Sequence, residues 1–337
     1  MRDCSEQMEA RMDESDLAKE VSDQPHGEED DNANGLTRRG VFQAATLAAA
    51  ATGIAAVSTR PAHALWPIKP TPRFKSVKPH EGGMFTYTIG YTDEEVYWWE
   101  GRNIGGAPIG VVQLSANIPM IPGNVGNAST FDFPLIYQPM EVTGDMVVSV
   151  EPHPEVLKRT IEAGKALESQ GCRAIVGNCG FFGNYQPLVA EALDAPFFST
   201  SLLQIPTILA TLKPGQKILV MTATGSVLEK APALENCGVS DRSRLVIAGA
   251  ENGSEMQKVL TVSGSYNPKK LEKELVDIAV ANTNKFPEIG AILLECTEFS
   301  AHAFAIQEAV GLPTWDFTTM INWVNSGLVR RPFSGYM

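Results

Sequence analysis

The sequence is poor in cysteine, in basic residues and in long apolar runs, and each scarcity excludes a class of protein. Five cysteines in 337 residues, with no CxxC pair, are too few and too scattered for a disulfide scaffold. The net charge of −12, without a basic stripe or zinc-ligand spacing, argues against nucleic acid as a partner. Only an alanine-rich run near the N-terminus approaches the length of a membrane span. The composition is otherwise that of a globular protein.

The first 64 residues predict a leader. Residues 1–37 hold twelve acidic and three basic residues, so this segment is expected to be disordered. An arginine pair at 38–39, an uncharged run at 40–59 and Ala-His-Ala at 62–64 follow in the order of a twin-arginine export signal. We therefore expect export to a periplasm or to a plastid or thylakoid lumen. An alanine-rich helix beside a chance arginine pair is the alternative.

The remainder divides into a proline-rich arm with an aromatic segment (65–107) and a region of alternating strands and helices (108–337). Strands are predicted at 84–91, 108–115, 173–177, 196–199, 217–222, 244–248, 291–294 and 313–317, and helices at 154–169, 184–193, 201–212, 226–235, 268–283, 301–310 and from 318. Such alternation predicts an α/β fold with a mostly parallel sheet. Ligands of these sheets bind beyond the carboxyl ends of the strands.

An internal repeat is the most informative feature of the chain. When the sequence is shifted by 117 positions, Cys179 falls on Cys296, and both cysteines follow a predicted strand and precede a predicted helix. The other identities pair Ala174 with Ala291, Ile175 with Ile292, Phe182 with Phe299, Glu191 with Glu308, Ala192 with Ala309 and Pro196 with Pro313. The repeat predicts two halves related by pseudo-twofold symmetry, with the cysteines in equivalent places.

Their position predicts a chemical role for these two cysteines. A thiol between a strand and a helix N-terminus is expected to be exposed in the cleft, with a pKa lowered by the helix dipole. If the two thiols face each other, one of them, as a thiolate, would remove a proton from carbon, while the other thiol would donate a proton or stay protonated. Two buried apolar cysteines, or a disulfide between them, are the alternatives. Cys172 and Cys237 have no partner in the repeat and are interpreted as structural.

Asn178-Cys179-Gly180 and Glu295-Cys296-Thr297-Glu298, with the loop at 122–134, resemble motifs of the aspartate/glutamate/hydantoin racemase superfamily. The resemblance covers most of residues 108–326. It implies two flavodoxin-like, doubly wound parallel-sheet halves with the site between them. It also implies catalysis by Cys179 and Cys296 without cofactor, metal or pyridoxal phosphate.

Two departures from the racemase pattern shift the expected reaction. Gly180 follows the first cysteine, where racemases have Thr, and Glu295 precedes the second, where Gly is usual. These residues resemble the branch that contains the algal dimethylsulfoniopropionate lyases of the Alma type. That resemblance implies a homotetrameric lyase that releases dimethyl sulfide and acrylate from a small carboxylate substrate. A racemase with the same cysteines, or an exported binding protein without catalysis, are the alternatives.

The candidate substrate contacts follow from this chemistry. The carboxylate is assigned to Thr297, Ser129 or Thr130, beside Asn178 and Gly180 of the first motif. The sulfonium is assigned to an aromatic surround, foremost Trp98 and Trp99, because a cation is attracted to the face of a ring. Further aromatic candidates, each more often a core residue, are Tyr97, Phe181, Phe182, Tyr185 and Trp315.

Two polar residues near the second cysteine have open interpretations. Glu298 either orients a thiol or caps the first turn of a helix, and capping is the more common role. His302, one turn further along, is expected to be a surface residue rather than a catalyst.

Overall fold

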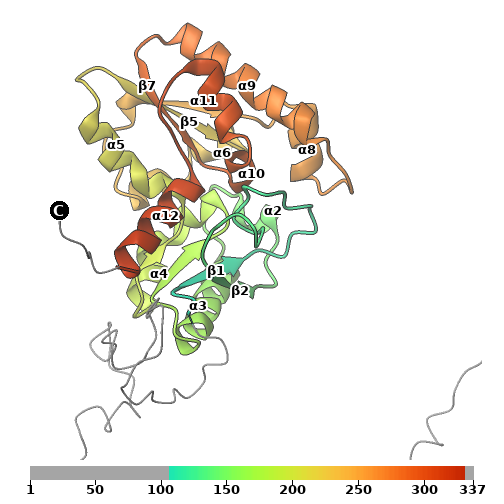
Figure 1. Cartoon of the computed structure of the whole chain (residues 1–337), viewed down its shortest axis with the longest axis vertical. Coiled ribbons are helices and arrows are strands. Elements are labelled where there is room, and N and C mark those ends of the chain that lie inside the picture. Colours follow the sequence, from blue (N-terminus) through green and yellow to red (C-terminus); the bar gives the residue numbers. More distant parts are fainter. Residues whose placement is uncertain (1–105, 331–337) are drawn as a thin grey trace, which may run out of the picture. The chain divides into compact units, whose positions relative to one another are not determined.

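The structure, a computed structural model, describes residues 106–330 (Figure 1). They form two four-stranded sheets in which every strand pair is parallel. The strand order is β2-β1-β3-β4 in the first sheet and β6-β5-β7-β8 in the second. The second order repeats the first, which confirms the predicted α/β fold with two pseudo-symmetric parallel halves. We call them the first lobe and the second lobe.

The strands of the first lobe are β1 (Ile109–Gln113), β2 (Leu135–Pro139), β3 (Ala174–Gly177) and β4 (Phe197–Phe198), and those of the second are β5 (Lys217–Thr222), β6 (Leu245–Gly249), β7 (Ile289–Leu294) and β8 (Thr314–Trp315). The α-helices are α2 (Gly144–Val147), α3 (Pro154–Ser169), α4 (Gln186–Ala192), α5 (Ile205–Thr211), α6 (Gly225–Leu228), α7 (Ala233–Asn236), α8 (Ser254–Leu260), α9 (Pro268–Lys285), α10 (Thr297–Ser300), α11 (Ala303–Val310) and α12 (Phe317–Leu328). Short 3-10 helices are η2 (Gly180–Tyr185), η3 (Ser201–Gln204) and η4 (Arg242–Arg244).

The central strands of both lobes are buried on both faces. Every residue of β3 is buried, as are all but one residue of β1 and of β5. Strands of this kind need apolar cover on each side, which explains why their sequences are continuous apolar runs rather than alternating ones. The carboxyl ends of β1, β3, β5 and β7 remain for polar loops, and these loops carry the candidate site.

The two lobes exchange helices. After β4, η3 and α5 pack on the second sheet, where Leu202, Ile205 and Ile208 share a core with Ile218 and Leu293. After β8, α12 returns to the first sheet, and Figure 1 shows both crossings. The residues that α12 buries against β1 and β3 are Phe317, Met320, Ile321 and Val324. Because each lobe completes the core of the other, the exchange fixes how the two lobes lie against one another.

The structure refines several predicted elements. The helix at 154–169 and the strand at 217–222 have the predicted bounds. The helix predicted at 226–235 is wrong as one unit: it is divided into α6 and α7, with Pro232 as the N-cap of α7, because proline lacks the N–H that a continuous helix requires. Strand β2 and helix α8 were not predicted.

Other predictions concern residues that the structure does not describe. The leader with its export signal, the strand at 84–91 and the arm up to residue 105, which includes Tyr97, Trp98 and Trp99, all lie outside the described residues. Within residues 106–330, no helix is long and apolar enough to cross a membrane.

Candidate functional site

A cavity of about 530 Å³ lies where the carboxyl ends of the central strands of both lobes meet. Its lining residues from the first lobe follow β1 (Leu114, Ser115, Ala116, Asn117, Ile118, Met120), belong to the α2 region (Thr143, Gly144, Asp145, Val148) or follow β3 (Asn178, Cys179, Gly180, Phe181). Those from the second lobe follow β5 (Ala223, Thr224), belong to the α8 region (Met256, Val259, Leu260, Val262) or follow β7 (Glu295, Cys296, Thr297, Glu298). Both predicted catalytic cysteines therefore line one cavity, one from each lobe.

The two cysteines occupy equivalent positions, as the repeat predicted. Cys179 is the N-cap of η2, two residues after the end of β3, and Cys296 is the N-cap of α10, two residues after the end of β7. Both are free thiols, so the structure shows no disulfide between them. Cys179 is partly buried, whereas Cys296 is only 8% exposed. Whether the pair is catalytic stays a prediction.

The predicted electrostatics of these thiols were wrong. Burial, and then the charge of Glu295, raise the pKa of Cys179 instead of lowering it. Burial, and then Glu298 and Glu295, raise the pKa of Cys296 well above its ordinary value. The helices that follow are one 3-10 segment and a four-residue turn, too short for a large dipole. Desolvation and nearby carboxylates disfavour a thiolate, and here they outweigh the helix ends.

Glu298 is in direct contact with one thiol. The Cys296 Sγ donates a hydrogen bond to Glu298 Oε2 at 2.9 Å. Asn124 Nδ2 donates to Glu298 Oε1 at 3.3 Å from the first lobe, so the carboxyl group is held on both sides. Of the two open interpretations of Glu298, the structure shows the contact with the thiol. A carboxylate in this position is placed to receive the thiol proton.

Asn178 and Glu295 are a second symmetry-related pair, each preceding its cysteine. Asn178 Oδ1 accepts a hydrogen bond of 3.0 Å from the backbone N–H of Leu114, which follows β1. In the second lobe, Glu295 Oε2 accepts from the hydroxyl of Thr222, the last residue of β5, at 2.8 Å. Each side chain thus ties its cysteine loop to the neighbouring strand. One lobe uses an amide for this purpose and the other a carboxyl group.

Gly180 and Thr297 join the two cysteine loops across the lobes. The Thr297 hydroxyl donates to the backbone oxygen of Asn178 at 3.2 Å. Gly180 packs so closely on Glu295 that an added Cβ would overlap its carboxyl group. Both residues line the cavity as predicted, but the Thr297 hydroxyl is also engaged in this lobe-to-lobe contact. Only glycine fits where the loop backbone passes the buried carboxyl group.

The structure does not bring Ser129 and Thr130 to the cavity. The Thr130 hydroxyl donates to the backbone oxygen of Asn124 at 2.6 Å and accepts from the Gly123 N–H at 3.0 Å. The exposed Ser129 bonds to Asn127 within the same turn. Both hydroxyls shape the loop that presents Asn124 to Glu298, so they act on the site from a distance. The sequence predicted the loop, but it did not predict the direction in which the side chains of Ser129 and Thr130 point.

The remaining candidates divide between cavity and core. Phe181 lines the cavity, whereas Phe182 and Tyr185 are buried in the core of the first lobe and Trp315 lies outside the cavity lining. The expectation for His302 was wrong: it is 3% exposed, because it lies beneath α9, where its Nδ1 is 3.3 Å from Glu272 Oε2. Burial lowers the pKa of this histidine, so it is predominantly neutral at neutral pH.

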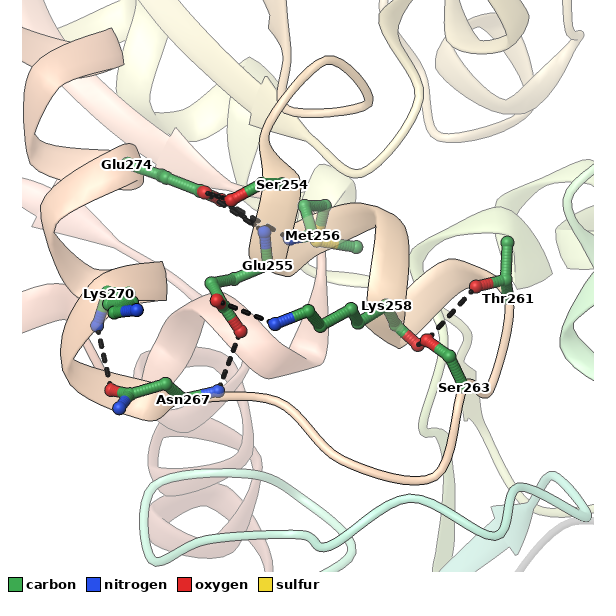
Figure 2. A network of polar contacts seen from close by, with 9 residues as sticks. All are labelled: Ser254, Glu255, Met256, Lys258, Thr261, Ser263, Asn267, Lys270 and Glu274. Carbon is green, nitrogen blue, oxygen red and sulfur yellow. Dashed lines mark hydrogen bonds and ion pairs between the residues drawn. The ribbon is translucent and has the colours of Figure 1, made fainter.

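The sequence did not predict α8, which with the residues after it forms one wall of the cavity. A polar network pins this short helix to the start of α9 (Figure 2). The buried Glu255 accepts from Lys258 Nζ at 2.9 Å and from the Asn267 N–H at 2.7 Å, while Glu274 accepts from the Ser254 hydroxyl at 2.9 Å. In the sequence, Asn267 followed by Pro268 indicates only the start of α9, the helix to which this network attaches α8. The network gives a seven-residue helix a fixed place at the cavity.

Val262 stands at the end of this wall in a strained conformation. Its φ is +49°, the only positive φ of a non-glycine residue in the part of the chain that the structure describes. The Val262 N–H donates to Val259 O and the Ser263 N–H to Lys258 O, a Schellman ending in which glycine is usual. A β-branched side chain is unfavourable there. The strain is maintained at a residue that lines the cavity.

We expect the Val262→Gly variant to be more stable than the natural protein. Relief of the strained φ should raise the free energy of unfolding by about 1 kcal/mol, which corresponds to a Tm increase of about 2–4 °C. Thermal unfolding of both proteins measures this difference. Val276→Gly on α9 is the matched control, because glycine in a helix interior should lower the Tm. An unchanged or lower Tm for Val262→Gly would mean that the valine side chain contributes more than its backbone strain costs.

The cavity lining is acidic. Carboxyl groups reach it from Asp145, Glu295 and Glu298, and among residues 106–330 no lysine, arginine or histidine lines it. Burial raises the pKa of Glu295 to about 7, with Glu298 contributing in the same direction. Within residues 106–330, no cluster of three histidine, cysteine or acidic side chains could hold a metal ion. Such a lining favours a ligand that carries positive charge over one with a net negative charge.

Several known proteins are similar to this chain in sequence. Dimethylsulfoniopropionate lyase 7 of Emiliania huxleyi is 29% identical over 235 residues, which cover 67% of this chain and 69% of that protein. The chain is a homologue of these lyases. Lyase 6 of the same organism is 30% identical over 67% of this chain, and a lyase of Durusdinium sp. clade D is 28% identical over 75%. The chain spans 61% of the length of lyase 6 and 88% of the Durusdinium lyase.

Two solved structures align with this chain. Unliganded arylmalonate decarboxylase aligns with a TM-score of 0.43 and 16% identity, over 68% of this chain and 94% of that one. Glutamate racemase RacE1 of Bacillus anthracis aligns with a TM-score of 0.44 and 14% identity, over 66% of this chain and 84% of that one. No family model matches the chain.

Proposed function

We propose that this protein is a cofactor-independent lyase that cleaves dimethylsulfoniopropionate to dimethyl sulfide and acrylate with a cysteine base. The observation that carries the proposal is the cavity itself: two symmetry-related thiols with acidic groups around them and, in the part of the chain that the structure describes, no basic side chain in the lining. The homology to dimethylsulfoniopropionate lyases supports the same substrate. The name of a relative alone would not distinguish this reaction from others of similar proteins.

The charge of the cavity discriminates between substrate classes. Dimethylsulfoniopropionate is a zwitterion with a permanent sulfonium cation and one carboxylate. Aspartate and glutamate carry two carboxylates and a net negative charge at neutral pH. A buried anion without a cationic partner is costly, and here it would also face Asp145 and Glu298. The sulfonium instead neutralises these groups, so the acidic lining favours the zwitterion.

Cys296 is the better candidate for the base, because its thiol is already bonded to a proton acceptor. Transfer of the Sγ proton to Glu298 gives a thiolate, which then removes the proton from the carbon next to the substrate carboxylate. The electrons of that C–H bond form the C=C bond, and the C–S bond breaks toward sulfur, which leaves as neutral dimethyl sulfide. Acrylate is the second product. Cys296 regains a proton, and Glu298 releases one to solvent.

The raised thiol pKa is compatible with this role once substrate is bound. In the free site, desolvation and two carboxyl groups hold Cys296 in its neutral form. A sulfonium in the same cavity places a positive charge beside the sulfur, which favours the thiolate. The base would therefore form mainly when the substrate is present. This arrangement protects the thiol from other electrophiles, since the thiolate is the reactive form.

Polar groups that carry no charge are available for the substrate carboxylate. Ser115, Asn117, Thr143 and Thr224 all line the cavity. Cys179 faces the same space from the other lobe and is proposed to position the substrate, since an elimination requires a single base. A racemase would instead need both thiols to exchange protons with carbon, and their symmetrical placement at the two strand ends keeps this second function open.

The decisive experiment compares both reactions with purified protein. We expect headspace chromatography to detect dimethyl sulfide, with an equal amount of acrylate, from dimethylsulfoniopropionate. Aspartate and glutamate incubated in deuterated water should show no deuterium at the alpha carbon. Deuterium incorporation with inversion, in the absence of dimethyl sulfide, would replace the lyase proposal by the racemase. Ligand affinity without any turnover would indicate a binding protein.

A further inference from the structure

We propose that Glu295 is a positioning residue that controls the charge of the cavity, allowing a thiolate to form when its carboxyl group is neutral and suppressing it when the group is ionised. The consequence for turnover rests on the proposed function. The control of thiol ionisation itself does not, because it concerns only groups of this chain.

The first observation is that Glu295 has an unsatisfied, fully enclosed oxygen. The residue is 1% exposed, and its Oε1 has no hydrogen-bond partner. Its Oε2 is occupied by the Thr222 hydroxyl, and Oε1 packs on the backbone of Gly180. A buried carboxylate normally has a cationic partner or several donors at both oxygens. Here one oxygen has neither, which favours the protonated form.

The second observation is that the structural role does not need a carboxyl group. Asn178, at the equivalent place in the first lobe, ties its cysteine loop to the strand with a neutral amide that accepts from Leu114. Glu295 makes the corresponding tie in the second lobe by accepting from the hydroxyl of Thr222, the last residue of β5. An amide at position 295 would therefore be sufficient for the fold. The carboxyl group adds one property that the amide lacks, which is the ability to change charge.

The third observation is the surrounding set of titratable groups. Four of these groups line the cavity: Cys179 after β3, Cys296 and Glu298 at the start of α10, and Asp145 on α2. Cys237 at the end of α7 does not line the cavity, but burial and then the charge of Glu295 raise its pKa. All of these groups are neutral or negative. None of these described groups is a cation, so none of them compensates the effect of a negative charge on Glu295 on the thiols.

The directions of the pKa shifts of Glu295 and of the two thiols agree with this proposal. Burial raises the pKa of Glu295 to about 7, so its charge changes near neutral pH. Glu295 in turn raises the pKa of Cys179 and of Cys296. Protonation of one carboxyl group is thus coupled to the ionisation of two thiols on opposite lobes, as expected for interacting sites in a low-dielectric cavity.

The test is the pH dependence of thiol alkylation in the Glu295→Gln variant. Iodoacetamide labelling of Cys179 and Cys296, followed by mass spectrometry from pH 5.5 to 9 on the full-length protein, reports the thiolate fraction. Near pH 5.5, where Glu295 of the natural protein is neutral, both proteins should react at similar rates. Above pH 8 the variant should react about tenfold faster for each unit by which its thiol pKa is lower. The rate ratio should rise with a midpoint near the pKa of about 7 of Glu295.

Asp316→Asn is the matched control, since Asp316 is a buried acid that caps α12 and does not line the cavity. Asparagine preserves such a cap, and the alkylation profile should not change. Identical profiles for Glu295→Gln and the natural protein would overturn the proposal, as would an equal change in both variants. A rising ratio in a protein that releases no dimethyl sulfide would retain the charge control and refute only the lyase.

Discussion

Replacement of Cys296 by alanine is expected to lower kcat for dimethyl sulfide release by about 10²–10⁴-fold, the contribution of a positioned general base. The hydrogen bond of 2.9 Å from its Sγ to Glu298 identifies this thiol as the one with a proton acceptor. Because the side chain is small and lies at the cavity, the variant should remain folded, which circular dichroism would verify. Gas chromatography of the headspace at saturating substrate measures the effect.

Two further variants make this experiment specific. Cys237→Ala removes a buried thiol that does not line the cavity, and it should retain most of the activity. Glu298→Gln removes the acceptor but not the thiol, so kcat should fall while the KM for substrate changes less. Full activity in Cys296→Ala would refute the assignment of the base. If Cys179→Ala then abolished activity, the roles of the two thiols would be reversed.

Stability should depend on pH through Glu295. Its pKa is about 7 in the folded protein and near 4.5 in the unfolded chain, so the folded state binds this proton more tightly. The free energy of unfolding therefore decreases as pH rises from 4.5 to about 7, by on the order of 3 kcal/mol for this group. Glu295→Gln lacks this proton. Between pH 4.5 and 7, the free energy of unfolding of the variant should therefore rise by on the order of 3 kcal/mol relative to that of the natural protein.

Urea unfolding at several pH values measures this difference, and Glu255→Gln provides the opposite case. Glu255 is also buried, but the Asn267 N–H and Lys258 lower its pKa. Its contribution is fully present above pH 4.5 and is lost only as pH falls further, so the difference between this variant and the natural protein should be flat from pH 4.5 to 7. A flat difference for Glu295→Gln as well would show that its carboxyl group is ionised at little cost.

The two glutamates illustrate how the same side chain serves different purposes in one fold. Glu255 is fully partnered and holds α8 against α9, so its charge stabilises the wall of the cavity. Glu295 has one oxygen without a hydrogen bond and, among residues 106–330, no cationic partner, so its charge destabilises the fold and opposes thiolate formation. Residues that are kept at a cost to stability are typical of functional sites, where the surrounding structure maintains them. Val262 at φ +49° is a second example on the same cavity.

By itself, the sequence determined the fold class and the two thiols. Alternating apolar runs and amphipathic segments predict βαβ units because these periods are local, and the repeat at 117 residues predicts two halves with equivalent cysteines. The expectation of a lyase came from the resemblance carried by the motifs at 178–180 and 295–298. Each of these signals lies within a short segment of the chain, even though the two copies of the cysteine motif are 117 positions apart.

Only the tertiary structure decided which groups surround the thiols. Glu298, which accepts the hydrogen bond of the Cys296 thiol, is held by Asn124 of the other lobe, and these two polar residues are 174 positions apart. The exchange of α5 and α12 and the wall formed by α8 likewise depend on packing between distant segments. The sequence pattern predicted lowered thiol pKa values, and this prediction was wrong for the same reason. Desolvation and charge act through space, and a local pattern of strand, cysteine and helix contains neither.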